Sequence, residues 1–168
     1  MALKVAIQKS KEVALWREYK DDDGKVLAEF KIRGDGYKPY RVALERANNQ
    51  IASKGFEVSE AGIGDKLFHE LLIEAAACHL IADWKGIEFD ENGKITAQTC
   101  TAETATKLLS MGDIGVAVWV FVKTQAQSIQ QEADAYEADI LGKSTTSIDT
   151  TALNGTPKKR VKSTKGQV

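Results

Sequence analysis

The sequence predicts an α+β fold that is mainly helical, in which an N-terminal β-hairpin joins a small bundle of helices. Two strand-like runs flank an Asp-Gly turn near the N-terminus, four later segments have helical features, and the C-terminal segment has no periodic apolar pattern. The 168 residues, 43% hydrophobic and 28% charged, are enough for one domain with a core. We therefore expect a single globular domain over residues 1–143 and a flexible basic tail over residues 144–168.

The hairpin is expected at about residues 12–33. Runs at 12–19 and 26–33 flank Asp22-Asp23-Gly24, and Asp-Gly indicates a hairpin because Gly accepts the positive φ of such turns. Apolar residues in the second run recur with a period of two, which predicts one apolar face. A lone hairpin is marginal in water. It must therefore pack on the helices or pair with another chain, and the sequence leaves both open.

Four helices are expected after the hairpin. Pro39 suits the first turn of a helix that ends near residue 54, and a short helix is expected at 101–111. Between them, residues 65–83 are apolar around most of a helical circumference, with Asp65 as N-cap, which predicts a central core helix. The fourth helix is expected at 113–141. Its run Val116–Val122 alone would favour a buried strand.

The residues that follow this run favour a helix, because apolar residues continue at alternating spacings of four and three. We therefore expect one helix, buried at its start and amphipathic later; its apolar residues are Val122, Ala126, Ile129, Ala133, Tyr136 and Ile140.

The segment Asp83-Trp84-Lys85-Gly86 is interpreted as a helix end. Trp84 would anchor the last turn, Lys85 would complement the negative end of the helix dipole, and Gly86 would supply the C-cap. A tight polar turn at residues 90–94 and a second helical region would follow.

No motif in the sequence indicates catalysis, a metal site or a cofactor. His69-Glu70 begins like a zinc-protease helix, but the fourth position after His69 holds Ile73, and His79 lies ten residues on. Neither the glycine patterns of nucleotide-binding loops nor a GxSxG nucleophile elbow occurs. Cys78 and Cys100 lack zinc-ligand spacing and are interpreted as small buried hydrophobic residues. We expect a non-enzymatic protein.

Charge is unevenly distributed along the chain, whose formal net charge is −1. Residues 144–168 contain five basic residues and one acidic residue, a net charge of +4, which leaves −5 for residues 1–143. This tail could be a phosphate-binding arm or an extension that folds on an acidic or helical partner. Aromatic residues do not interleave the basic ones, which disfavours a nucleic-acid partner read by base stacking.

No apolar stretch approaches the roughly 18–20 residues of a membrane-spanning helix, and the N-terminus lacks the apolar run of a signal peptide. We expect a soluble intracellular protein with no membrane partner.

Taken together, residues 12–141 resemble the tail assembly chaperones of long-tailed bacteriophages, of the siphovirus type. The resemblance rests on an ordered set of features: the hairpin around Asp22-Asp23-Gly24, the apolar helix ending in Asp83-Trp84-Lys85-Gly86-Ile87, the turn Asp90-Glu91-Asn92-Gly93-Lys94, a short helix, and the long helix after Gly112-Asp113.

The resemblance implies a phage or prophage protein that acts in the host bacterial cytoplasm and is absent from the mature virion. Such chaperones bind the long helical tape measure protein, keep it soluble and help to recruit tail tube subunits. The chain is similar to the short form of these proteins, so a frameshifted long form of itself is an expected partner. Lys158 and Lys159 could be encoded by an adenine run on which the frameshift occurs.

A chaperone for an apolar helical partner needs an exposed apolar face. We expect that face at the edge of the hairpin or on the amphipathic half of the last helix, formed by Ala126, Ile129, Ala133, Tyr136 and Ile140. Two other functions remain open: a structural tail-completion or tube-associated protein that uses the hairpin for strand addition, and a small nucleic-acid-binding regulator that uses the basic tail. The sequence also leaves open whether the chain forms a homo-oligomer.

Overall fold

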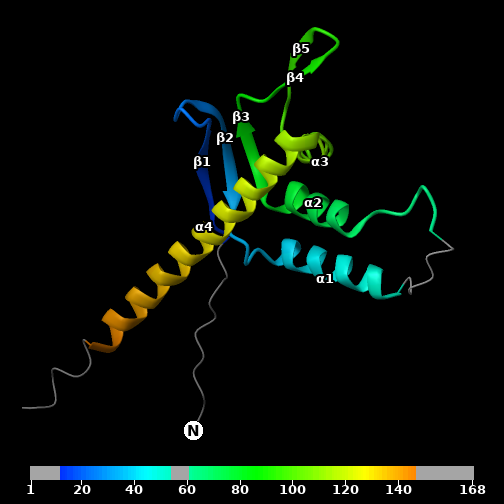
Figure 1. Ribbon diagram of the computed structural model, residues 1–168. Coiled ribbons are helices and arrows are strands. Elements are labelled where there is room, and N and C mark those ends of the chain that lie inside the picture. Colours follow the sequence, from blue (N-terminus) through cyan, green and yellow to red (C-terminus); the bar gives the residue numbers. More distant parts are fainter. Residues whose placement is uncertain (1–11, 54–60, 147–168) are drawn as a thin grey trace, which may run out of the picture. The chain divides into compact units, whose positions relative to one another are not determined.

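The computed structural model describes residues 12–53 and 61–146. The expected tail, including Lys158 and Lys159, lies almost wholly outside the described residues. The α+β class is confirmed: an N-terminal hairpin is followed by four helices and further strands. In order (Figure 1), the elements are β1 (Ala14–Lys20), β2 (Val26–Arg33), α1 (Lys38–Ser53), α2 (Phe68–His79), β3 (Ile81–Lys85), β4 (Glu88–Glu91), β5 (Lys94–Ala97), α3 (Ala102–Leu109) and α4 (Gly112–Thr146).

Packing divides the chain into two compact units. The first, here called the body, ends at Asp134, and the second begins at Ala135 within α4. The last turns of α4 therefore belong to a different unit from its first turns. The body contains every strand, helices α1 to α3 and the part of α4 that packs on the core.

The hairpin forms as expected and lies on the helices. β1 and β2 pair antiparallel, with Tyr19 opposite Ala28 and Arg17 opposite Phe30. In the loop, the Asp21 carboxylate accepts the N–H groups of Asp23 and Lys25 at 3.1 and 2.8 Å, and Gly24 takes a φ of +81°. Acidic residues at this loop thus stabilise the turn.

The hairpin is completed by a third strand, at residues whose apolar pattern predicts the end of a helix. α2 ends at His79, and β3 pairs antiparallel with β2 so that Trp84 lies opposite Phe30. The expected helix end at Asp83 is therefore wrong: Asp83, Trp84 and Lys85 are strand residues. A two-stranded hairpin gains stability from a third strand with an apolar inner face. Ile81 and Trp84 supply that face and are buried.

Gly86 ends the third strand rather than capping a helix. Its φ is +78°, and a Cβ there would lie 3.3 Å from the carbonyl oxygen of Leu27 on β2. Glycine is therefore required for the backbone conformation and is favoured by the close approach of the neighbouring strand.

The polar turn at residues 90–94 is the tip of a second hairpin, β4–β5. Asn92 and Gly93 both have positive φ, of 56° and 83°, as a two-residue type I′ turn requires. The Asp90 carboxylate accepts the N–H of Gly93 at 2.8 Å. The helix expected at 101–111 after this turn is present as α3, with strand β5 between the turn and the helix.

The sheet has one apolar and one charged face. Ala28, Phe30 and Ile32 on β2 are buried. On the same face, Phe121 of α4 contacts the rings of Tyr19 and Phe30 at centroid distances of 5.1 and 6.1 Å. Figure 1 shows α4 crossing this sheet.

On the opposite face of the sheet, Lys85 of β3 reaches across β2. Its ammonium lies 4.2 Å from the ring centroid of Trp16 on β1 and 3.4 Å from a carboxylate oxygen of Glu29. The interpretation of Lys85 as a partner of a helix dipole is therefore wrong.

The helices enclose the core beside the sheet. α1 and α2 lie side by side and antiparallel (Figure 1). The consecutive small residues Ala75, Ala76 and Ala77 of α2 are buried, which allows close approach of neighbouring elements on several sides. The central position expected for this helix agrees with that burial, although it begins at Phe68 rather than after Asp65. Asp65 instead accepts the N–H of Gly62 at 3.0 Å.

Candidate partner-binding surfaces

The apolar stripe of α4 is divided between the core and solvent. Val118, Val122, Ala126 and Ile129, spaced by four, four and three residues, are buried in the body, and Ile129 is 0% exposed. Ala126 and Ile129 therefore cannot form the expected partner-binding face, and that part of the prediction is wrong. The physical reason is that an apolar helical stripe can pack either on a sheet of its own chain or on an external partner, and the spacing of its residues is the same in both cases.

Polar contacts hold this part of α4 against the hairpin. Arg17 of β1 donates to both carboxylate oxygens of Glu132 at 3.0 and 3.1 Å. The N–H of Gly36 donates to Oε1 of Gln130 at 3.1 Å, and the N–H of Asp35 donates to the carbonyl of Ala126 at 3.2 Å. Strand β1 and the segment that follows β2 therefore hold α4 in place between Ala126 and Glu132.

The stripe continues beyond the body with exposed residues. Ala133 is half-buried, whereas Tyr136 and Ile140 are 69% and 48% exposed and Leu141 is also exposed. Tyr136 and Ile140 stand four residues apart and so share one helical face. We name Tyr136, Ile140 and Leu141 the α4 end face.

A second apolar strip lies at the start of α4, so the expectation that this part of the helix is buried is only partly correct. Ile114, Val116 and Val120 are exposed, while Trp119 beside them is half-buried beneath the ammonium of Lys123, 4.6 Å from its ring centroid. Val116 and Val120 are four residues apart, so they share a face. The continuous apolar run at 116–122 places apolar residues on every face of the helix. Since a surface helix buries only one face, this run indicates that some of these residues are exposed.

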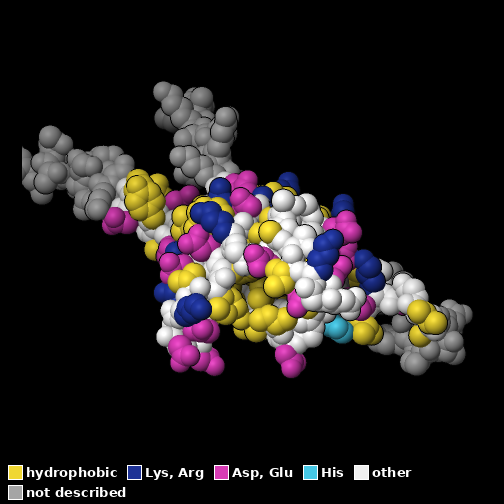
Figure 2. Space-filling view, turned by 90° about the horizontal axis from the view of Figure 1, so that it is seen from above, with side chains coloured by type: hydrophobic (Ala, Val, Ile, Leu, Met, Phe, Trp, Pro, Cys, Tyr) yellow, Lys and Arg dark blue, Asp and Glu magenta, His cyan; other side chains and the backbone are white. Residues whose placement is uncertain are grey.

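Exposed apolar side chains also gather as a group rather than singly. In the space-filling view, hydrophobic side chains form a continuous area near the middle of the viewed face, with acidic and basic side chains around it (Figure 2). Contiguous exposed apolar area of this kind marks interaction surfaces more often than isolated residues do.

A groove of about 680 Å³ lies between α1 and α2. Its floor is apolar. Three basic residues, Lys38, Arg46 and Lys66, and one acidic residue, Glu74, also line it. Lys66 and Glu74 form an ion pair at 2.5 Å. The apolar residues that line this groove, which we name the α1–α2 groove, are Pro39, Val42, Ala43, Ala47, Leu71 and Ala75.

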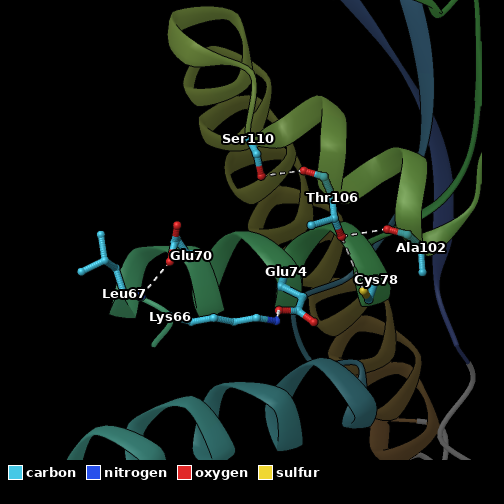
Figure 3. A network of polar contacts seen from close by, with 8 residues as sticks. All are labelled: Lys66, Leu67, Glu70, Glu74, Cys78, Ala102, Thr106 and Ser110. Carbon is cyan, nitrogen blue, oxygen red and sulfur yellow. Dashed lines mark hydrogen bonds and ion pairs between the residues drawn. The ribbon is translucent and has the colours of Figure 1, made fainter. Parts of the chain in front are cut away.

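The acidic residues of α2 are engaged in local contacts (Figure 3). Glu70 accepts the N–H of Leu67 at 2.7 Å, which satisfies an amide at the start of the helix. Glu74 pairs with Lys66, and the sulfur of Cys78 lies 3.9 Å from the hydroxyl oxygen of Thr106 on α3. Within the described ranges, no three His, Cys, Asp or Glu side chains are grouped closely enough to hold a metal ion.

His79 and Cys100 lie in partly buried positions near the start of the third strand. Burial lowers the pKa of the His79 imidazole, and the positive charge of Arg33 lowers it further; Arg33 also donates to the carbonyl of His79 at 3.1 Å. Burial raises the pKa of the Cys100 thiol to about 11, helped by the Asp83 carboxylate and opposed by Arg33. Both cysteines are free and half-buried rather than fully buried.

The raised pKa of Cys100 predicts a poorly reactive thiol. Because the thiolate is the nucleophile, a rise from 9.0 to about 11 lowers the reactive fraction at pH 8 by about 100-fold. We expect iodoacetamide to modify Cys100 about 100-fold more slowly in the folded protein than in urea, as measured by peptide mass spectrometry. Equal rates in both states would contradict the burial of this thiol.

The Asp83-Trp84-Lys85-Gly86 segment has a structural role at the β3 edge of the sheet. The indole N–H of Trp84 donates to the carbonyl of Gln98 at 2.8 Å, and its ring packs edge-on against Phe30 at a centroid distance of 6.3 Å. The Asp83 carboxylate accepts the N–H of Trp84 at 2.8 Å. The segment thus joins the sheet to the chain that leads from β5 into α3.

No single helix in the described ranges is long and apolar enough to cross a membrane. By length and composition alone, α3 and residues 112–142 of α4 would qualify together, as a pair bent by 114°.

These features define a small α+β protein that exposes apolar helical faces and a groove between two helices. The family model for the YdaY prophage protein matches residues 35–143, more than half of the chain. The chain belongs to this family and is a phage-derived protein. The match begins after β2 and covers α1 through most of α4. Comparisons with curated proteins and with solved structures give no match.

Proposed function

We propose that this protein is a non-enzymatic tail assembly chaperone that binds the tape measure protein in the host bacterial cytoplasm. It keeps that partner soluble, helps to recruit tail tube subunits and does not enter the mature virion. Two observations support the phage setting of the proposal: the membership of a prophage protein family and the sequence resemblance over residues 12–141. The α4 end face is the structural observation that carries it.

The α4 end face suits a long, helix-rich partner. A helix recognises another helix through apolar side chains spaced by three or four residues, and Tyr136 and Ile140 have that spacing and are exposed. Complete burial of such a side chain contributes at most about 1.5–3 kcal/mol before the cost of association, and less for Ile140, which is only 48% exposed in the free protein. Several copies along one partner chain would then keep its apolar stripes from aggregating.

Co-expression with the long helical protein encoded in the same prophage tests the proposal. We expect the wild-type chain to keep that protein in the soluble fraction. Tyr136→Asp and Ile140→Asp should move most of it to the pellet, because each places a carboxylate in the apolar contact. Gln127→Asp is the matched control, since it adds the same charge at an exposed position of the same helix.

Solubility that persists with both α4 end variants would refute the use of this face, provided that circular dichroism shows both variants folded. Purified phage particles test the other part of the proposal. Mass spectrometry should find the tape measure protein but not this chain, whereas a structural tail-completion protein would be present in the particles.

A further inference from the structure

The α1–α2 groove combines an apolar floor with a positive rim. Lys38 and Arg46 line it and are exposed. In the part of the chain that the structure describes, neither forms an ion pair with a carboxylate. Lys66, the third basic residue of the rim, is neutralised by Glu74. The rim therefore keeps two positive charges beside apolar side chains, which favours an apolar segment that carries acidic residues.

The α4 end face has the complementary composition. Its apolar members Tyr136 and Ile140 are exposed, and Glu137 follows Tyr136 directly. Residues 135–142 contain two acidic residues and no basic one. Two nearby acids are already engaged within the body, since Glu132 pairs with Arg17 and Asp134 accepts a hydrogen bond from Gln130 at 2.9 Å. Glu137, which follows the exposed Tyr136 directly, is thus placed to meet an external cation.

We propose that the α4 end face of one copy docks in the α1–α2 groove of a second copy. Tyr136 and Ile140 would lie on the apolar floor, and Glu137 would face Lys38 or Arg46. The contact joins two different surfaces, so it can close reciprocally within a dimer or extend to further copies. Either arrangement makes the mass of the assembly rise with protein concentration.

This docking also regulates the chaperone, a consequence that rests on the proposed function. The second copy and the tape measure protein bind the same α4 end face, so each excludes the other. Self-association therefore covers the apolar face while no partner is present, and partner binding releases the second copy. By mass action, excess partner lowers the mass of the chaperone assembly.

Sedimentation velocity of the full chain over a wide concentration range tests the contact. Arg46→Glu and Glu137→Arg should each weaken self-association by about tenfold or more, because each places like charges across the contact. An equimolar mixture of the two variants should restore association, because Glu at 46 then faces Arg at 137. Arg41→Glu, on the same helix but outside the groove lining, should change little.

A chain that stays monomeric at all concentrations would overturn the inference, as would an assembly that none of these substitutions affects. A mixture of Arg46→Glu and Glu137→Arg that associates no better than either variant alone would also overturn it. The co-expression assay separates this failure from that of the proposed function. Arg46→Glu should still solubilise the tape measure protein, whereas Tyr136→Asp should lose both self-association and solubilisation.

Discussion

Ile129→Asp is expected to destabilise the protein strongly, whereas the same substitution at Tyr136 leaves its stability nearly unchanged. Ile129 is fully buried between α4 and the rest of the body, whereas Tyr136 is 69% exposed. Removing a buried Ile side chain alone costs about 2–5 kcal/mol, and a carboxylate without a partner adds a desolvation cost. We expect a loss of at least about 4 kcal/mol in the free energy of unfolding, measured by urea denaturation.

Tyr136→Asp serves as the matched comparison, because both residues belong to one apolar stripe of one helix. Its free energy of unfolding should remain within about 0.5 kcal/mol of the wild-type value, as for most surface substitutions. Equal destabilisation by the two variants would show that the stripe is core along its whole length. The α4 end face would then not be a binding surface.

Phe30→Ala should destabilise the body nearly as much as Ile129→Asp does. Phe30 is fully buried at the centre of β2 and contacts three rings, those of Tyr19, Trp84 and Phe121, at 6.4, 6.3 and 6.1 Å. Truncation of a buried Phe costs about 3–5 kcal/mol. The urea midpoint should fall accordingly, with little change in the slope of the transition.

Trp16→Ala is the control for this prediction. Trp16 lies on the charged face of the same sheet and is 39% exposed, and its cation–π contact with Lys85 contributes about 0.5–1 kcal/mol at such a site. We expect a small loss of stability. A loss equal to that of Phe30→Ala would mean that the sheet buries both faces, contrary to the observed arrangement.

Local patterns in the sequence predicted much of the fold because they act over a few residues. The hairpin follows from Asp23-Gly24 and the alternation on β2. The short helix expected at 101–111 is α3, and the structure shows its cap, the Thr101 hydroxyl, which accepts the N–H of Thr104 at 3.1 Å. α4 follows from spacings of three and four, in spite of its β-branched start. In each case the residues that specify the element lie within it, so no distant partner is needed.

The errors share one physical cause, which is that β-pairing joins residues distant in sequence. Residues 81–85 continue the apolar pattern of α2, and only the free edge of β2 makes them a strand. The tip at Asn92-Gly93 is a hairpin signal that the sequence analysis interpreted as a turn between helices. Tertiary context overrides local propensity most readily in short segments such as these.

Only part of the partner-binding face expected on α4 is exposed. Tyr136 and Ile140 are exposed and Ile129 is buried, so binding by this face stays a prediction for the exposed residues. The groove between α1 and α2 was not predicted from the sequence. Its apolar floor is formed by residues of two helices that are distant in sequence, and its positive charges without a carboxylate partner among the described residues, Lys38 and Arg46, lie on α1. No local signal could reveal it.

The class of fold, the hairpin, the four helices and the apolar stripe of α4 can be predicted from local propensity and periodicity alone. The burial of Ile129, the exposure of Tyr136 and the place of Trp84 in a strand follow from contacts between segments distant in sequence. The reason is that burial depends on which surfaces meet. An apolar stripe shows that a helix can be buried, whereas the sheet that packs on it determines how far along the helix this happens.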